Sequence, residues 1–117
     1  MPGKAYEAAR RFWDVQDDGD YNQLVDLFTE DAVAEDDAVG RFEGKEAIAG
    51  FMAQMSKEMP ARGVHFEVQE IAGDDETAWA RWQAVFSDGQ RFDGVGIYKV
   101  RDGKLSYYRD YHAINRE

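Results

Sequence analysis

The amino-acid sequence predicts an α+β fold in which three N-terminal helices pack on one face of a mostly antiparallel sheet. In the first half of the chain apolar residues recur at helical spacing, and from Val64 onward they recur at every second position, as in strands. Asp-Gly pairs at residues 88–89 and 102–103 are typical of tight turns between antiparallel strands. No repeat or linker interrupts the sequence, so residues 1–117 are predicted to form a single domain.

Three helices are predicted before residue 60. The first spans about residues 4–16, and the second, shorter helix begins at Asp20, which has the capping-box partner Gln23 three residues later. The third spans about residues 45–58 and is closed by Pro60. The side chains predicted to be buried are Ala5, Ala9, Phe12 and Trp13 in the first helix, Tyr21, Leu24, Leu27 and Phe28 in the second, and Ile48, Phe51, Met52, Met55 and Met59 in the third.

The predicted strands differ in length and polarity. Residues 32–39 hold three consecutive acids and are predicted to form a short edge strand with solvated carboxylates. Four longer strands follow from Val64, and the alternation slips near Ile71, which indicates a bulge or a strong twist. The second of these strands spans residues 77–87 and the last spans residues 103–112. Neither face of the 77–87 strand is plainly polar.

Composition limits the partners of this chain. With 24 acidic and 14 basic residues the net charge is -10, which disfavours binding to nucleic acid and to anionic membrane surfaces. The N-terminus has no apolar leader and no apolar run approaches a membrane span, so we expect a cytoplasmic protein. There is no Cys, and His65 and His112 are the two His residues of the chain. We therefore expect no metal and no other cofactor.

Four phrases of the sequence, taken in order, resemble one known superfamily. They are Gly19-Asp20 followed by residues 24–32, then residues 42–48, residues 102–105 and residues 108–111. Together they resemble the nuclear transport factor 2-like superfamily, and within it the SnoaL-like and ketosteroid isomerase-like domains. The resemblance implies a cone-shaped fold, in which a curved sheet wraps the first helix and leaves a deep apolar pocket. It says less about activity, because this fold hosts enzymes and non-catalytic domains.

The resemblance also implies which side chains face the pocket. If Asp110 points inward, strand alternation directs Ser106, Tyr108 and His112 inward as well. The family register turns Trp79, Arg81, Gln83 and Val85 inward and leaves Ala78, Ala80, Trp82, Ala84 and Phe86 outside. An exposed apolar stripe of that size favours an interface, so we expect a homodimer through the outer sheet face, including Trp82 and Phe86. The alternative is a reversed register with Trp82 in the core.

Asp110 and Asp36 are the candidate catalytic acids. An unpaired charge inside an aromatic strand is costly, and Arg81 is the predicted partner that would keep Asp110 ionised as a general base. The alternative is a structural ion pair without catalysis. Asp36 matches the general-base Asp of ketosteroid isomerases, and its alternative is a solvated acid on an edge strand.

Three positions depart from the family patterns. Ketosteroid isomerases have a Tyr where this chain has Phe12 and a protonated acid at about Gly96, and both stabilise the enolate. Limonene epoxide hydrolase-like members have an Arg and an Asp two residues apart on one strand and another Asp on the last strand. Arg81 and Asp110 match two of these, but Gln83 stands where the second Asp should be. SnoaL-like cyclases use an acid/base carboxylate with aromatic walls, and of the three patterns theirs requires the fewest specific residues of this sequence.

The expected function is therefore broad. We expect a cofactor-independent enzyme that acts on a small apolar, oxygen-bearing molecule through a pocket Asp, by isomerase, cyclase or epoxide hydrolase chemistry. The alternative is a non-catalytic ligand-binding or dimeric assembly domain of the same fold. The candidate substrate-binding residues, each of which has a plain core or surface role as its alternative, are Tyr6, Trp13, Trp79, Gln83, Tyr98, Tyr108 and His112.

Overall fold

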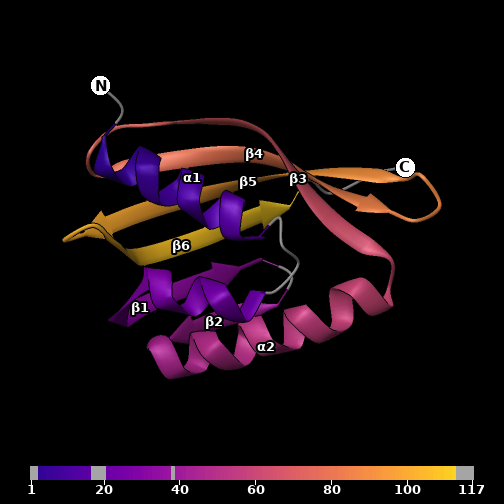
Figure 1. The fold of residues 1–117 in the computed structure, drawn as a ribbon, viewed down its shortest axis with the longest axis horizontal. Helices are drawn as coiled ribbons and strands as arrows, with labels where there is room; N and C mark the ends of the chain where they lie inside the picture. Colours follow the sequence, from indigo (N-terminus) through magenta and orange to yellow (C-terminus); the bar gives the residue numbers. More distant parts are fainter. Residues whose placement is uncertain (1–2, 17–20, 38, 113–117) are drawn as a thin grey trace.

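The structure of the protein is a computed structural model that describes residues 3–16, 21–37 and 39–112. Its elements in chain order are α1 (Lys4–Gln16), the 3₁₀-helix η1 (Tyr21–Leu27), β1 (Phe28–Asp36), β2 (Gly40–Glu43), α2 (Lys45–Ala61), β3 (Val64–Gly73), β4 (Thr77–Phe86), β5 (Arg91–Arg101) and β6 (Lys104–His112). Figure 1 shows the six strands as one curved sheet. The predicted α+β class and cone-shaped fold are confirmed.

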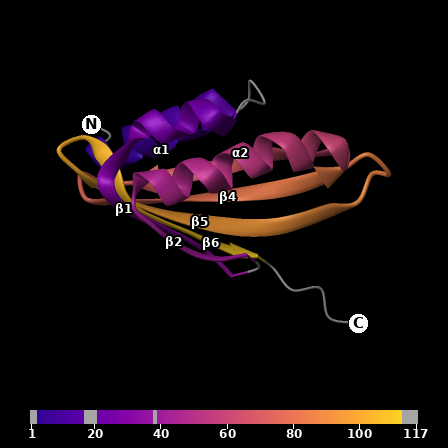
Figure 2. The same cartoon turned by 90° about the horizontal axis from the view of Figure 1, so that it is seen from below.

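The strand order in the sheet is β2-β1-β6-β5-β4-β3. All neighbouring strands are antiparallel except β1 and β6, which pair in parallel. Both α1 and α2 lie on the same side of the sheet (Figure 2). Since β1 lies between β2 and β6, it is an interior strand, and the predicted edge strand at residues 32–39 is wrong.

The second and third predicted helices differ in detail from the structure. Residues 21–27 form a 3₁₀-helix, and Phe28, predicted in that helix, begins β1. The predicted cap Asp20 lies outside the described residues. Pro60 lies inside the last turn of α2 and does not end it. The helix continues for one residue beyond Pro60, and Arg62 is its C-cap.

The core lies between α1 and the inner face of the sheet. Ala5 and Ala9 of α1, like Ala78 and Ala80 of β4, are fully buried, and these small side chains allow the helix to pack closely on the strands. Phe12 is at the centre of an aromatic cluster, where its ring lies 5.0–6.5 Å from the rings of four neighbours. These neighbours are Trp13, Phe28, Tyr98 and Tyr108.

The predicted register of β4 is wrong, and the reversed register is the one observed. Trp82 is 3 % exposed and faces the interior, as do the buried Ala residues on either side of it. Arg81 is exposed, and Trp79 and Gln83 lie beside it on the outer face. The physical reason is the packing of α1, which requires the small Ala side chains beneath it. The stripe with Trp82 and Phe86 is therefore no outer surface for a homodimer, and dimerisation itself stays a prediction.

Strands β1, β3 and β6 each contain an irregularity, and the register of β1 against β6 shifts between Phe28 and Val33. The register of β3 shifts between Val68 and Glu70, which confirms the bulge predicted in this strand close to Ile71. The register of β6 shifts at Ser106, so Leu105 is fully buried and the predicted inward direction of Ser106 is wrong. Beyond this shift, Tyr108 and Asp110 face the pocket as predicted. Within the described residues, no helix is long and apolar enough to cross a membrane.

Candidate functional site

A cavity of about 220 Å³ lies between the helices and the inner face of the sheet. Most of its wall is apolar. The lining residues are Phe12, Trp13 and Gln16 of α1, Tyr21 and Leu24 of η1, Phe51, Met52, Met55 and Met59 of α2 with Arg62 beyond it, Phe66, Trp82 and Tyr108 of the sheet, Val39, and the polar group Asp36, Asp110 and His112. An apolar cavity with a few convergent polar groups is the usual form of a small-molecule site.

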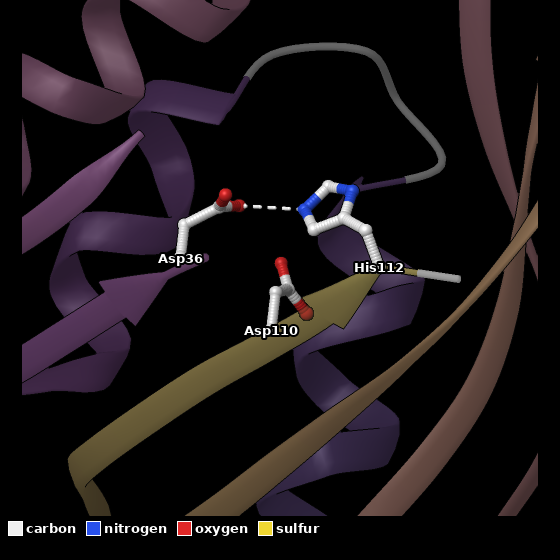
Figure 3. Close-up of side chains that lie close together, drawn as sticks. All are labelled: Asp36, Asp110 and His112. Atoms are coloured by element: carbon white, nitrogen blue, oxygen red, sulfur yellow. Dashed lines mark hydrogen bonds and ion pairs between the residues drawn. The ribbon is translucent and has the colours of Figure 1, made fainter. Parts of the chain in front are cut away.

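Asp36, Asp110 and His112 form the polar group of this pocket. Asp36 ends β1 and lies opposite Asp110 of β6 in the parallel pairing, so both side chains project from the same face. His112 follows two residues after Asp110 and has the same direction. Figure 3 shows the three side chains pointing toward one another, and one ligand atom from each lies within 4.8 Å of the others.

Hydrogen bonds fix His112 against Asp36. The Nε2 atom of His112 lies 3.0 Å from Oδ2 of Asp36, and the backbone N–H of His112 donates to Oδ2 of Asp37 at 3.0 Å. The ring of His112 meets the ring of Trp82 edge-on, with centroids 5.3 Å apart. The hydrogen bond to Asp36 raises the pKa of His112, which favours the imidazolium at neutral pH.

Asp110 is held by two neutral donors. The hydroxyl of Tyr108 donates to Oδ2 of Asp110, and Nε1 of Trp82 donates to Oδ1 at 3.2 Å. Burial raises the pKa of Asp110 from 3.8 to about 7, and the hydrogen bond from Tyr108 opposes this rise. Burial also raises the pKa of the Tyr108 phenol well above its ordinary value, so Tyr108 stays a donor. The pocket thus contains a carboxyl group that can give or take a proton near neutral pH.

The same three residues could offer ligand atoms to a metal ion. Two carboxylates and one imidazole suit a divalent cation such as Zn²⁺ or Mn²⁺. In the structure these atoms are engaged with protein partners, since His112 binds Asp36 and both oxygens of Asp110 accept hydrogen bonds. The expectation of a metal-free site stays a prediction.

Arg81 and Gln83 are not part of the site. Nε of Arg81 lies 3.5 Å from Oε1 of Glu70, and Nε2 of Gln83 donates to Oδ1 of Asp93 at 2.9 Å, all on the outer face. The predicted pair of Arg81 with Asp110 is wrong, because the register of β4 turns Arg81 away from the interior. Trp82 takes its place as the neighbour of Asp110.

The other predicted lining residues divide into two groups. Trp13, Tyr108 and His112 line the pocket. Tyr98 is fully buried outside the lining, where its hydroxyl accepts a hydrogen bond from Nε1 of Trp13 at 2.8 Å. The half-buried Tyr6 and the outer-face Trp79 do not line the pocket, which corrects their predicted role.

Sequence reasoning missed several lining residues. Met52, Met55 and Met59 were predicted as core, although they recur on the face of α2 that borders the cavity. Trp82 could have been assigned to the interior from the small Ala residues at every second position around it. Arg62 gave no signal, because one basic residue after a helix is common.

A family model described as a SnoaL-like domain matches residues 9–108. This match covers most of the 117 residues, including Asp36 and β6 up to Tyr108. The chain belongs to the SnoaL-like domain family. The fold and the family resemblance expected from the sequence are thereby confirmed.

Solved structures with the nuclear transport factor 2-like (NTF2-like) fold are similar to this SnoaL-like domain. An NTF2-like protein of unknown function from Mesorhizobium loti is 26 % identical, with a TM-score of 0.79, and the match covers 94 % of this chain and 91 % of that one. For a ketosteroid isomerase candidate from Kribbella flavida the corresponding values are 22 %, 0.80, 97 % and 81 %. For an LEH-like epoxide hydrolase from M. tuberculosis they are 22 %, 0.72, 94 % and 83 %. The comparison with curated proteins gives no match.

Proposed function

We propose that this SnoaL-like domain is an enzyme that transfers protons within a small apolar molecule bearing a carbonyl or similar oxygen group, as isomerases do. The observation that carries the proposal is the meeting of Asp36, Asp110 and His112 in the wall of an apolar pocket. Burial raises the pKa of Asp110 to about 7, which is close to the pH at which general acid–base catalysis is most effective.

The two carboxyl groups have complementary roles in the proposed reaction. Asp36, positioned by His112, takes a proton from a carbon next to the substrate carbonyl. Protonated Asp110 gives its proton to the carbonyl oxygen, and an enol results. Asp36 then returns its proton to a different carbon while Asp110 recovers its own, so the product is an isomer and the enzyme is restored. The same acid and base would also serve a ring closure of the cyclase type.

The position of Asp110 supports this assignment, because its carboxyl group replaces one of the two groups that the isomerase pattern requires. A Cβ atom at Gly96 would lie 3.0 Å from Oδ1 of Asp110, so Asp110 brings a carboxyl group close to the expected position of the acid from the next strand. The Tyr108 ring packs on Phe12, with centroids 5.0 Å apart. Its hydroxyl donates its proton to Asp110, so Tyr108 orients this acid and does not replace the donor that is missing at Phe12.

Epoxide hydrolysis of the limonene epoxide hydrolase type has less support. Arg81 and Gln83, two of the three positions matched to that pattern, face away from the pocket. Asp110 is the only matched acid that remains near the cavity.

A non-catalytic binding domain is the second candidate. The observation that favours it is the complete pairing of Asp110, since both of its oxygens accept hydrogen bonds from Tyr108 and Trp82. A carboxyl group paired in this way can have a purely structural role, in which it orders the pocket wall. In that case ligands would raise the melting temperature but would not be converted.

The replacement Asp110→Asn tests the enzyme proposal. A panel of ketones, lactones, epoxides and terpenoids is first screened by thermal shift, and binders are then assayed for isomerisation by absorbance or NMR. We expect Asp110→Asn and Asp36→Asn each to lower turnover by about 10²-fold or more, because an amide cannot exchange the proton. Both variants should keep the wild-type circular dichroism spectrum.

Asp14→Asn is the matched control, because Asp14 is exposed on α1 and the change removes one negative charge outside the pocket. It should leave turnover unchanged. Full turnover in Asp110→Asn would contradict its catalytic role. Binding without conversion by the wild-type protein, together with a lower melting temperature in Asp110→Asn, would favour the binding domain.

A further inference from the structure

Arg62 lies at the border of the pocket, directly after α2. Its backbone N–H donates to the carbonyl oxygens of Glu58 and Met59 at 3.0 and 3.1 Å, which fixes its position at the helix end. Within the described part of the chain its guanidinium has a single, loose ion pair, with Nη2 lying 3.9 Å from Oε1 of Glu58, and the Arg62 side chain is 66 % exposed. Exposed pairs of this kind contribute little, so this guanidinium is available to a ligand.

A second cavity adjoins the first at Arg62. It measures about 370 Å³ and extends over the inner faces of β3, β4 and β5 toward Phe86 and Phe92. Five residues line both cavities, and these are Met59, Arg62, Phe66, Trp82 and His112. The first cavity alone is smaller than most ligand pockets, whereas a ligand that reaches Arg62 can also use the second.

The two cavities together form a cleft that has a defined length and polarity. Met52, Met55, Met59 and Arg62 recur at helical spacing, so the backbone of this wall rises by about 15 Å along the helix axis from Met52 to Arg62. Methionine side chains adapt to varied apolar shapes. Among the described residues that line the two cavities, Arg62 is the only Lys or Arg. Asp36 and Asp110 repel an anion from their part of the first cavity, and Asp93 repels it from its part of the second.

From this arrangement we infer that the ligand is an elongated apolar carboxylate, and that Arg62 binds its carboxylate group at the border of the two cavities. Planar guanidinium groups match carboxylates through two parallel hydrogen bonds. The apolar body would lie along the Met side chains, and the oxygen group to be converted would lie at Asp36 and Asp110. This inference rests on the proposed function only for the role of the reacting end; binding of the carboxylate does not need catalysis.

The test compares three probes of one length, namely decanoate, methyl decanoate and decylamine, at concentrations below micelle formation. Binding is measured by tryptophan fluorescence, to which Trp13 and Trp82 in the wall contribute, and by thermal shift. We expect the wild-type protein to bind decanoate on the order of tenfold more tightly than its methyl ester. In Arg62→Ala this preference should disappear, and in Arg62→Glu decylamine should become the preferred probe.

Arg10→Ala is the matched control, because Arg10 is exposed on α1 and lines neither cavity. Arg10→Ala should keep the preference for decanoate. If this variant loses the preference, the effect is one of general charge and the inference is overturned. Equal losses for acid and ester in Arg62→Ala would also overturn it, since they would indicate lost packing alone.

Asp110→Asn separates this inference from the proposed function. The variant should keep the decanoate preference while it loses turnover. If the wild-type protein converts no compound but Arg62 still selects the carboxylate, the proposed function fails and this inference stands. If turnover depends on Asp110 but acid and ester bind equally, the inference fails and the proposed function stands.

Discussion

Asp110 shows how the choice of partner sets the chemistry of a buried acid. The sequence suggested Arg81 as its partner, and a guanidinium would lower the pKa of the carboxyl group and keep it a fixed anion. The structure instead gives Asp110 the neutral donors Tyr108 and Trp82. Neutral donors only partly oppose the effect of burial, so the pKa rises to about 7. Asp110 is therefore able to act as an acid or as a base at neutral pH.

This shift predicts a pH-dependent stability. Because the pKa of Asp110 rises from 3.8 to about 7 on folding, the folded protein keeps a proton that the unfolded chain loses, and stability falls as pH increases through this window. His112, whose pKa is also raised, stabilises the fold at low pH and loses this effect as pH rises through its folded pKa. The wild-type melting temperature should fall between pH 5 and 8, and it should fall less in Asp110→Asn.

Thermal unfolding monitored by circular dichroism at several pH values measures this difference. Asp14→Asn, which changes an exposed acid, should follow the wild-type curve. Parallel curves for the wild-type protein and Asp110→Asn would contradict the raised pKa.

At the scale of elements, the local sequence pattern predicted the helices well, but it predicted poorly which face of a strand points to the interior. The spacing in residues 4–16 gave α1 and its buried face, because one amphipathic pattern decides both. In β4 both faces hold a Trp, so alternation alone could not tell the interior from the exterior. The burial of Ala78 and Ala80 under α1 decides the register, and this is tertiary packing that no local window contains.

Gly94 on β5 provides a test of how β4 and β5 hold the site. It lies opposite Trp82, and a Cβ atom at Gly94 would come within 2.2 Å of Cζ2 of the Trp82 ring. Gly94→Ala should therefore displace the indole, break its hydrogen bond to Asp110 and lower the free energy of unfolding by about 1–3 kcal/mol. Urea unfolding measures the change, and ligand binding to the pocket should weaken with it.

Gly50→Ala is the matched control for this replacement. Gly50 is exposed on α2, and no atom lies within 4 Å of the added Cβ. Since Ala favours a helix over Gly, the control should be stabilised by up to about 1 kcal/mol. Equal stability of Gly94→Ala and the wild-type protein would show that Trp82 moves freely and would contradict the packing described above.

At the scale of the molecule, the site depends on one long-range pairing. Asp36 and Asp110 are each visible in the sequence, yet their meeting requires the parallel pairing of β1 with β6. The three consecutive acids at residues 35–37 suggested a solvated edge strand, because local polarity is the usual sign of exposure. Only the order of all six strands places β1 inside the sheet and Asp36 in the pocket wall.

The outer face of the sheet is where we expect a homodimer. The stripe with Trp82 is internal, but the opposite face presents the partly exposed apolar side chains of Trp79, Val95 and Ile97, with Tyr111 47 % exposed beside Val95. Exposed apolar side chains that adjoin one another favour association. The net charge of -10 on each chain opposes it, so association should strengthen with salt.

Light scattering after size exclusion tests this expectation. The wild-type protein should have twice the 13.4 kDa mass of one chain, and Ile97→Glu should be a monomer, because the change buries a charge in the interface. Gln54→Glu adds the same charge on the exposed surface of α2 and should remain a dimer. A wild-type mass of 13.4 kDa at all concentrations and salt levels would exclude the dimer. A monomeric Gln54→Glu would instead assign the effect to net charge, since α2 lies on the opposite side of the sheet from Ile97.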